Sequence, residues 1–173
     1  MPKYLKCDEA FAKCKTEGCF IPLEKIDLEK IKSTLDISDT DFNSAKILKD
    51  NIAKDSKVWN SVYKLSYDAL HELVEAFLRF DKIKSDNHQC LFAYLCEKHP
   101  ELEFSWDFFE KVRTKRNGIN YYGTPITYQD WKEVEMQLNL YMNKLKQEIE
   151  KKVIKIRRQV PTPTLKCQKS EDF

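Results

Sequence analysis

The stretch SKVWNSVYKLSYDALHELVEAFLRF, residues 56–80, decides the fold. Its apolar side chains recur at steps of three and four positions, the spacing that places them on one face of an α-helix. These positions are Trp59, Val62, Tyr63, Leu70, Leu73, Phe77 and Phe80, with Tyr67, Val74 and Leu78 beside them. The opposite row pairs charges of opposite sign four residues apart, which stabilises an exposed helix face. The stretch therefore predicts a central core helix.

Amphipathic stretches on both sides of this segment predict further helices. The predicted ranges are residues 5–16, 23–52 (two short helices or one broken helix), 88–99, 106–122 and 131–153. Gly18 and Gly123 follow two of these ranges where a helix C-cap is expected, and Pro100 stops a third. Thr127 and Asp130 have the spacing of a capping box before the last helix. The pattern predicts an all-α helical bundle with a short N-terminal helical extension.

Length and composition favour one domain without sheets. The chain has 173 residues but only three glycines, which leaves little material for hairpin turns. Charged residues make up 34% of the chain and the net charge is only +2, so any nucleic-acid-binding surface must be local. We expect a single domain over residues 1–158. Residues 159–173 combine prolines and polar residues without an apolar period, which predicts a flexible tail.

The cysteines and the absence of long apolar runs predict a cytoplasmic protein with reduced thiols. The chain begins MPKYLKCDEA, without the apolar core of a signal peptide, and no run approaches the length that a membrane span needs. Cys7, Cys14 and Cys19 lack the close C-x-x-C pair of structural zinc sites. We therefore expect no membrane segment, no metal and no cofactor.

An arginine interrupts the apolar stripe of the predicted helix over residues 106–122. The stripe consists of Trp106, Phe109, Val112, Arg116 and Ile119. Burying a guanidinium is costly unless it pairs with an anion. Arg116 is expected to pair with a carboxylate such as Asp68 or Glu72, or to extend to the surface. The alternative partner is a phosphate, whose oxygens fit the planar guanidinium.

Basic, amide and aromatic residues interleave around this arginine in KVRTKRNGINYYG, residues 111–123. The basic members are Lys111, Arg113, Lys115 and Arg116, and the others are Asn117, Asn120, Tyr121 and Tyr122. Such a set can neutralise phosphates and stack on bases, although it is also typical of a solvated helix face. The basic run KKVIKIRR, residues 151–158, complements the dipole of the last helix and is a second candidate for RNA contact.

Two longer segments resemble the HEPN domains, helical-bundle proteins associated with RNA cleavage, toxin–antitoxin systems and nucleotidyltransferases. The segments are VYKLSYDALHELVEAFLRFDKIKSDNHQCLFAYL (residues 62–95) and KRNGINYYGTPITYQDW (residues 115–131), and the similarity spans roughly residues 56–150. The resemblance implies an up-and-down antiparallel bundle of four to five main helices. It also implies a homodimer in which the site helices of two subunits face each other across a cleft.

The HEPN motif is an Arg, often followed by Asn, and a His after four to six intervening residues. Arg116 and Asn117 match its first half, whereas Tyr121, Tyr122 and Gly123 occupy the positions for the His. The resemblance implies that Arg116 holds a phosphate. A tyrosine is a poor base near neutral pH, and loss of the base lowers the rate by roughly a hundredfold to ten-thousandfold.

The predicted function is therefore RNA or nucleotide binding with weak or absent nuclease activity. The candidate catalytic residues are Arg116, Asn117 and Tyr121, and the candidate nucleic-acid-binding residues are Arg113, Lys115, Asn120, Tyr122 and His88. His88 either approaches the cleft or caps and packs its helix. His71 is expected to be a satisfied, semi-buried side chain, and His99, beside Pro100, to lie at a surface helix end. The alternatives are a metal-independent endoribonuclease, and an interaction module for a nucleotidyltransferase or antitoxin partner.

Overall fold

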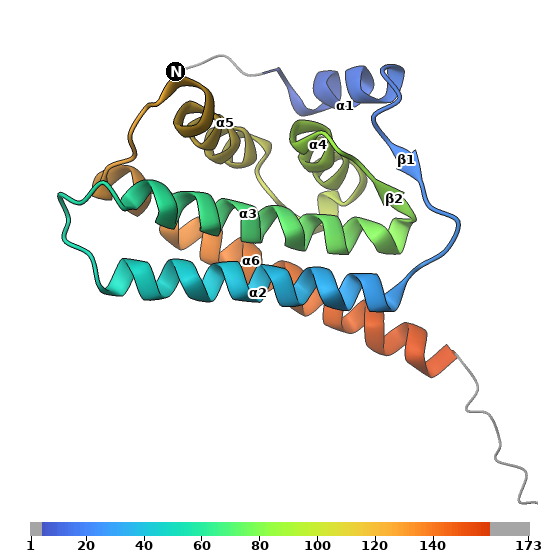
Figure 1. Ribbon diagram of the computed structural model, residues 1–173. Coiled ribbons are helices and arrows are strands. Elements are labelled where there is room, and N and C mark those ends of the chain that lie inside the picture. The colour runs from blue at the N-terminus through green and yellow to red at the C-terminus, as the bar shows by residue number, and fades with distance from the viewer. Residues whose placement is uncertain (1–4, 160–173) are drawn as a thin grey trace, which may run out of the picture.

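The computed structural model describes residues 5–159, and within this range it is an all-α helical bundle (Figure 1). The helices are α1 (Cys7–Thr16), α2 (Leu28–Asp50), α3 (Trp59–Leu78), α4 (His88–Lys98), α5 (Trp106–Tyr122) and α6 (Tyr128–Gln159), with the 3-10 helices η1 (Arg79–Asp81) and η2 (Pro100–Leu102). Two short strands, β1 (Ile21–Pro22) and β2 (Ile83–Lys84), pair antiparallel. The predicted fold class is confirmed. The predicted tail lies, from residue 160 on, outside the described residues.

Helix α3 lies at the centre of the bundle and is buried on nearly every side. Its buried positions include Tyr63, Tyr67, Leu70 and Phe77, none more than 1% exposed. In Figure 1, α2 runs antiparallel to α3, α6 crosses behind the pair, and α4 and α5 lie on the opposite side of α3. A helix that is apolar around most of its circumference must be enclosed in this way.

Residues 23–52 form one continuous helix over most of their length, rather than two. Asp27 caps α2 by accepting a hydrogen bond from the backbone NH of Lys30, and the helix continues to Asp50. The polar stretch inside it does not end the helix, because Ser38 is buried against α3 and donates a hydrogen bond of 2.8 Å to the carbonyl of Ala69. The Ser38 hydroxyl is thus bonded to the neighbouring helix and does not end α2.

The predicted end of α5 and the predicted capping box before α6 are confirmed. Gly123 follows α5 with φ +64°, a left-handed conformation that glycine adopts at little cost. Thr127 and Asp130 form the reciprocal capping bonds, from Asp130 NH to the Thr127 hydroxyl and from Thr127 NH to the Asp130 carboxylate. These two devices set the short turn that directs α6 back across the bundle.

Helix α1 packs on α4, and a disulfide joins Cys14 to Cys90 with a Cα–Cα distance of 5.6 Å. The expectation that all thiols are reduced is therefore wrong for these two cysteines. They are 76 residues apart, so only the packing of α1 on α4 brings them together. The indole NH of Trp106 also donates a hydrogen bond of 2.7 Å to the carbonyl of Leu5 and ties the start of the described chain to α5.

None of the described helices combines the length and the apolar character that a membrane crossing requires.

The aromatic cluster between α4, α5 and α6 generates a stability prediction. Phe109 is fully buried and stacks on Phe92 with ring centroids 4.5 Å apart, and Tyr141 of α6 lies 5.5 Å away. Replacing Phe109 with alanine leaves a cavity and is expected to lower the free energy of unfolding by about 3–5 kcal/mol in urea titrations. Met136 on α6 is 75% exposed, so Met136→Ala, as the control, should change it by less than about 0.5 kcal/mol. Equal effects would contradict this core assignment.

Candidate functional site

Arg116 lies on α5 and reaches α3. Its Nη2 donates a hydrogen bond of 3.2 Å to Oδ1 of Asp68, and its Cζ lies 5.4 Å from the centre of the Tyr67 ring. The side chains of Arg116 and Asp68 are 20% and 35% exposed, so the ion pair is at the edge of the core. The Nε of Arg116 is buried and has no hydrogen-bond partner among residues 5–159. The ion pair that the sequence suggests is confirmed, but it satisfies only part of the guanidinium.

Two histidines and a tyrosine pack beside this ion pair. Tyr67 and His71 are four residues apart on α3 and therefore share a face, while His88 is the first residue of α4. The hydroxyl of Tyr67 and Nδ1 of His88 are hydrogen-bonded at 2.8 Å. The rings of His71 and His88 stack with centroids 3.9 Å apart. The structure thus brings His88, a predicted site residue, into the neighbourhood of Arg116.

Both histidines are neutral at pH 7. Burial lowers the pKa of His71 to about 3, and the charges of His88 and Arg116 add to this effect. Burial also lowers the pKa of His88, again with a contribution from Arg116, although the Asp68 carboxylate opposes it. The expectation that His71 is a satisfied structural side chain holds only in part, because its Nε2 is buried without a partner among the described residues.

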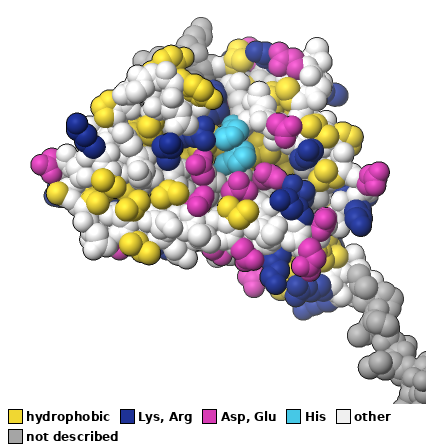
Figure 2. Space-filling view, viewed as in Figure 1, with side chains coloured by type: hydrophobic (Ala, Val, Ile, Leu, Met, Phe, Trp, Pro, Cys, Tyr) yellow, Lys and Arg dark blue, Asp and Glu magenta, His cyan; other side chains and the backbone are white. Residues whose placement is uncertain are grey.

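The space-filling view shows where this cluster meets the surface. In Figure 2, histidine atoms reach the surface near the middle of the face, and both acidic side chains and Lys or Arg side chains lie around them. The same region of Figure 1 is the space above α3, between α4 and α5. These three helices carry Asp68, His88 and Arg116, so the site is formed where α4 and α5 meet the polar edge of α3.

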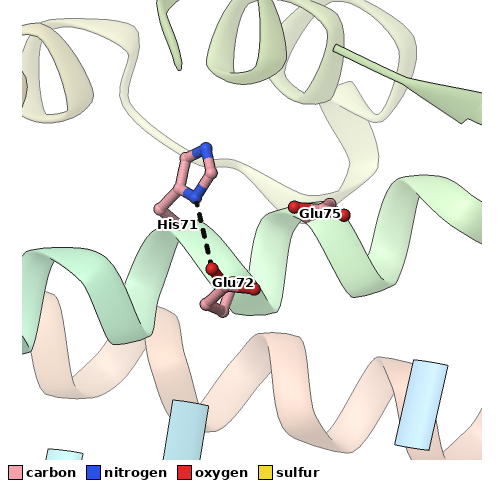
Figure 3. A group of neighbouring side chains, drawn as sticks. All are labelled: His71, Glu72 and Glu75. Carbon is pink, nitrogen blue, oxygen red and sulfur yellow. Dashed lines mark ion pairs between the residues drawn. The ribbon is translucent and has the colours of Figure 1, made fainter. Parts of the chain in front are cut away.

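One group on α3 has donor atoms close enough to hold a divalent cation. His71, Glu72 and Glu75 have potential ligand atoms within 4.8 Å of one another, and Nδ1 of His71 lies 4.0 Å from Oε1 of Glu72 (Figure 3). Burial raises the pKa of Glu72, and the neighbouring Glu75 adds to the shift. Arg79, however, donates a 2.6 Å hydrogen bond to Glu75 and neutralises it. Arg79 therefore takes up one of the three potential ligands, and we assign no metal to the group.

Arg113 has a structural role at the junction of α4 and α5. Its Nε and Nη2 donate to the two carboxylate oxygens of Glu110 at 2.7 and 2.9 Å. Gln89 of α4 donates a further hydrogen bond of 2.8 Å to the same carboxylate, which is only 1% exposed. A bidentate pair of this kind compensates the burial of both charges. Arg113 is therefore committed to Glu110 rather than presented to a ligand.

Lys115 faces α6 rather than the Arg116 cluster. Its Nζ donates to Asp130 at 2.5 Å and to Glu133 at 3.3 Å. Although burial opposes the shift, hydrogen bonds from Lys115 and Thr127 lower the pKa of Asp130 to about 2. Successive residues of a helix point about 100° apart. The basic residues of α5 consequently face three different neighbours, and the structure does not gather them into one patch.

The remaining predicted residues lie on the last turns of α5. Asn117 is half-buried and Asn120 is exposed. Tyr121 and Tyr122 are 73% and 83% exposed, which is unusual for large aromatic side chains. They can therefore stack on a base or contact another protein, but they do not join the histidine pair.

The structure adds Tyr67, His71 and Glu110 to the residues around the site. Sequence reasoning placed Tyr67 in the core and His71 in a structural role, and it did not consider Glu110. The spacing of Tyr67 and His71 is a signal for a shared helix face, but nothing in the sequence shows that His88 packs on that face. A half-buried guanidinium beside two neutral imidazoles can bind an oxyanion and donate ring NH groups to it.

The low pKa of His71 predicts a pH-dependent stability. Below pH 6.5 the unfolded chain protonates His71, whereas the folded protein keeps it neutral down to about pH 3, so stability falls as the pH is lowered through this window. Between pH 7 and pH 5 this linkage amounts to about 2 kcal/mol in the free energy of unfolding. His71→Gln should lose that much less stability than wild type over the same interval in urea titrations.

His99→Gln provides the control for this pH dependence. A hydrogen bond to Asp81 raises the pKa of His99, so its contribution is present below pH 6.5 and is lost as the pH rises. His99→Gln should therefore steepen the acid loss of stability. Identical pH profiles for wild type and His71→Gln would show that His71 is not held neutral by the fold.

Comparisons with known proteins give no match to a family model, a curated protein or a solved structure. The resemblance to HEPN domains over residues 56–150 therefore stays a prediction from the sequence. The function is argued from the geometry of the Arg116 cluster.

Proposed function

We propose that the protein binds RNA or a nucleotide through a phosphate held by Arg116, with nuclease activity weak or absent. The observation that carries the proposal is the incomplete pairing of this guanidinium. Its one hydrogen bond among the described residues is a 3.2 Å contact from Nη2 to the partly exposed Asp68. A phosphate offers a guanidinium shorter, bidentate hydrogen bonds than this contact provides.

The surroundings of Arg116 suit a phosphate that enters from the surface. Asp68 lies on the exposed side of the ion pair, and rotation of its side chain would open Nη2 to solvent. His71 and His88 are neutral at pH 7, so each carries one ring NH that can donate to an anion.

The exposed end of α5 supports contact with a base or with a second subunit. Tyr121 and Tyr122 project from the last turn of α5. Stacking of a base on an aromatic ring contributes about 1–3 kcal/mol and tolerates any sequence. We include in the proposal a homodimer in which the α5 helices of two copies face each other. An interaction with a nucleotidyltransferase or antitoxin through this end is the alternative without RNA.

A second candidate function is metal-independent endoribonuclease activity, which the position of His88 favours. The stretch after Arg116 lacks the motif histidine, but His88 packs nearby from α4 and has a neutral imidazole. Its Nδ1 is bonded to the Tyr67 hydroxyl, so Nε2 would have to accept the proton of a ribose 2′-hydroxyl. The lowered pKa of His88 makes it a weaker base than an unperturbed histidine.

The proposal includes a cytoplasmic location, where RNA and nucleotides are abundant. This location requires that the disulfide between Cys14 and Cys90 resist the reducing glutathione pool.

Arg116→Ala should weaken RNA binding. Loss of one charge-assisted contact of about 1.5–3 kcal/mol corresponds to a roughly tenfold to hundredfold higher Kd. The slope of log K against the logarithm of the salt concentration should also become less negative, by about 0.7 for single-stranded RNA and about 0.9 for a duplex. Filter retention of labelled RNA at two salt concentrations measures both effects. Lys25→Ala removes one positive charge from an exposed position outside both basic segments and should change Kd much less; equal losses would indicate diffuse binding to any basic residue.

Asp68→Asn should strengthen RNA binding. The substitution keeps the shape of the side chain but removes the charge that occupies Arg116, so a phosphate competes with a weaker partner. Retention assays under the same conditions should give a lower Kd than wild type. A Kd raised as far as that of Arg116→Ala would show that the ion pair itself, and not a free guanidinium, is what RNA binding needs.

Cleavage is followed in the same samples. The proposal expects intact RNA with wild type and with His88→Ala. RNA cut by wild type and spared by both Arg116→Ala and His88→Ala would replace the proposal with the endoribonuclease. If wild type neither cuts nor binds RNA, the interaction module remains. A mass equal to one subunit, measured by light scattering after gel filtration, would contradict the homodimer.

A further inference from the structure

The contact surface between α1 and α4 carries two cysteines from each helix. Cys7 and Cys14 lie on α1, and Cys90 and Cys96 lie on α4. Cys14 and Cys90 form the disulfide already described. Cys7 and Cys96 are free thiols, both half-buried. The surface thus holds one disulfide-bonded pair, Cys14 and Cys90, and one open pair, the free thiols of Cys7 and Cys96.

The disulfide sets a register that brings the open pair together. Cys7 precedes Cys14 by two helical turns, about 10 Å, and Cys96 follows Cys90 by about 9 Å at the rise of an α-helix. The thiol of Cys7 also contacts the carbonyl of Ala93 at 3.8 Å, one turn before Cys96. A residue early in α1 therefore lies against a residue late in α4, which is the arrangement of antiparallel neighbours.

The two thiols interact directly and unequally. Cys96 hydrogen-bonds to the sulfur of Cys7, which lowers the pKa of Cys7, and the same bond raises the pKa of Cys96. Burial and the carboxylates of Asp8 and Glu97 oppose the shift of Cys7. Cys7 is also the first residue of α1, where the positive end of the helix dipole favours a thiolate. Cys7 is therefore the nucleophile of the pair.

We propose that Cys7 and Cys96 are a redox-active dithiol that closes to a second disulfide between α1 and α4. The oxidant is a small-molecule disulfide such as oxidised glutathione. The Cys7 thiolate attacks one sulfur, breaks the S–S bond, and releases one glutathione thiolate, which takes a proton. The Cys96 sulfur, after losing its proton to solvent, then attacks the Cys7 sulfur and releases the second glutathione. Two electrons and two protons pass from the protein to the oxidant.

The second bond would change how firmly α1 is held. The existing disulfide fastens the C-terminal part of α1, at Cys14, to the start of α4. A bond from Cys7 to Cys96 would fasten its first residue as well, next to the hydrogen bond from Trp106 to Leu5. Oxidation of Cys7 and Cys96 would then fasten both ends of α1 to the bundle. Reduction of this second disulfide would release the N-terminal end of α1.

The test is thiol mapping of the full chain across a series of glutathione buffers, from reducing to oxidising. Free thiols are blocked with N-ethylmaleimide under denaturing conditions, and a non-reducing digest is read by mass spectrometry. We expect a Cys7–Cys96 cross-linked peptide to replace the two blocked peptides as the buffer becomes oxidising, while Cys19 remains blocked. The proposal would be overturned if Cys7 and Cys96 were both still blocked in the most oxidising buffer.

Two variants separate a reactive pair from thiols that are merely adjacent. In Cys96→Ser the resolving sulfur is absent, so Cys7 should accumulate as a mixed disulfide with one glutathione. Cys19→Ser, the matched control, removes a half-buried thiol outside the pair and should leave the cross-link unchanged. Circular dichroism of both variants checks that the helices are intact. A folded Cys96→Ser protein whose Cys7 never carries glutathione would also overturn the proposal, because Cys7 would then not be the attacking thiol.

Discussion

Enclosure of α3 is the constraint on which the rest of the structure depends. Its apolar residues cover most of its circumference, so neighbours are needed on every side: α2 along one side, α6 behind, and α4 and α5 on the remaining face. Burial of this area is the main favourable contribution to folding. The charged residues of α3 and His71 are only partly buried, at an edge that the neighbouring helices leave. Asp68, His71, Glu72 and Glu75 occupy that edge, and the candidate site therefore lies there.

Charge pairing within the bundle determines which basic residues of α5 remain available. Arg113 is held by the buried carboxylate of Glu110, and Lys115 by Asp130 at the start of α6. Arg116 has the weakest arrangement of the three, with one 3.2 Å contact to a partly exposed partner. Lys111 pairs with Glu133 of α6 at 3.2 Å, so among the four basic residues Arg116 is the candidate for phosphate binding beside the histidines. The selection follows from geometry, because each residue along the helix points to a different neighbour.

The two neutral histidines and the cysteine pair share a physical origin. In both cases α4 brings a side chain against a partner that is distant in sequence: His88 against Tyr67 and His71, and Cys96 against Cys7. Burial lowers the pKa of both imidazoles, whereas the hydrogen bond with Cys7, together with burial, raises the pKa of the Cys96 thiol. Both proposed sites therefore include residues of α4, one on its side toward α3 and one on its side toward α1.

The sequence by itself determined the all-α class, the central helix, the end of α5, the capping box at the start of α6, and the anomalous position of Arg116. These features depend on apolar periodicity and on capping residues, which act over one or two helical turns. It also named Asp68 and Glu72 as examples of a carboxylate partner for Arg116, beside a path to the surface and a phosphate. Only the tertiary structure decided that Asp68 is the partner, that α2 is continuous, that Cys14 bonds Cys90, and that His88 lies by Arg116. Each of these contacts joins residues from different helices, and their register depends on packing that no local pattern records.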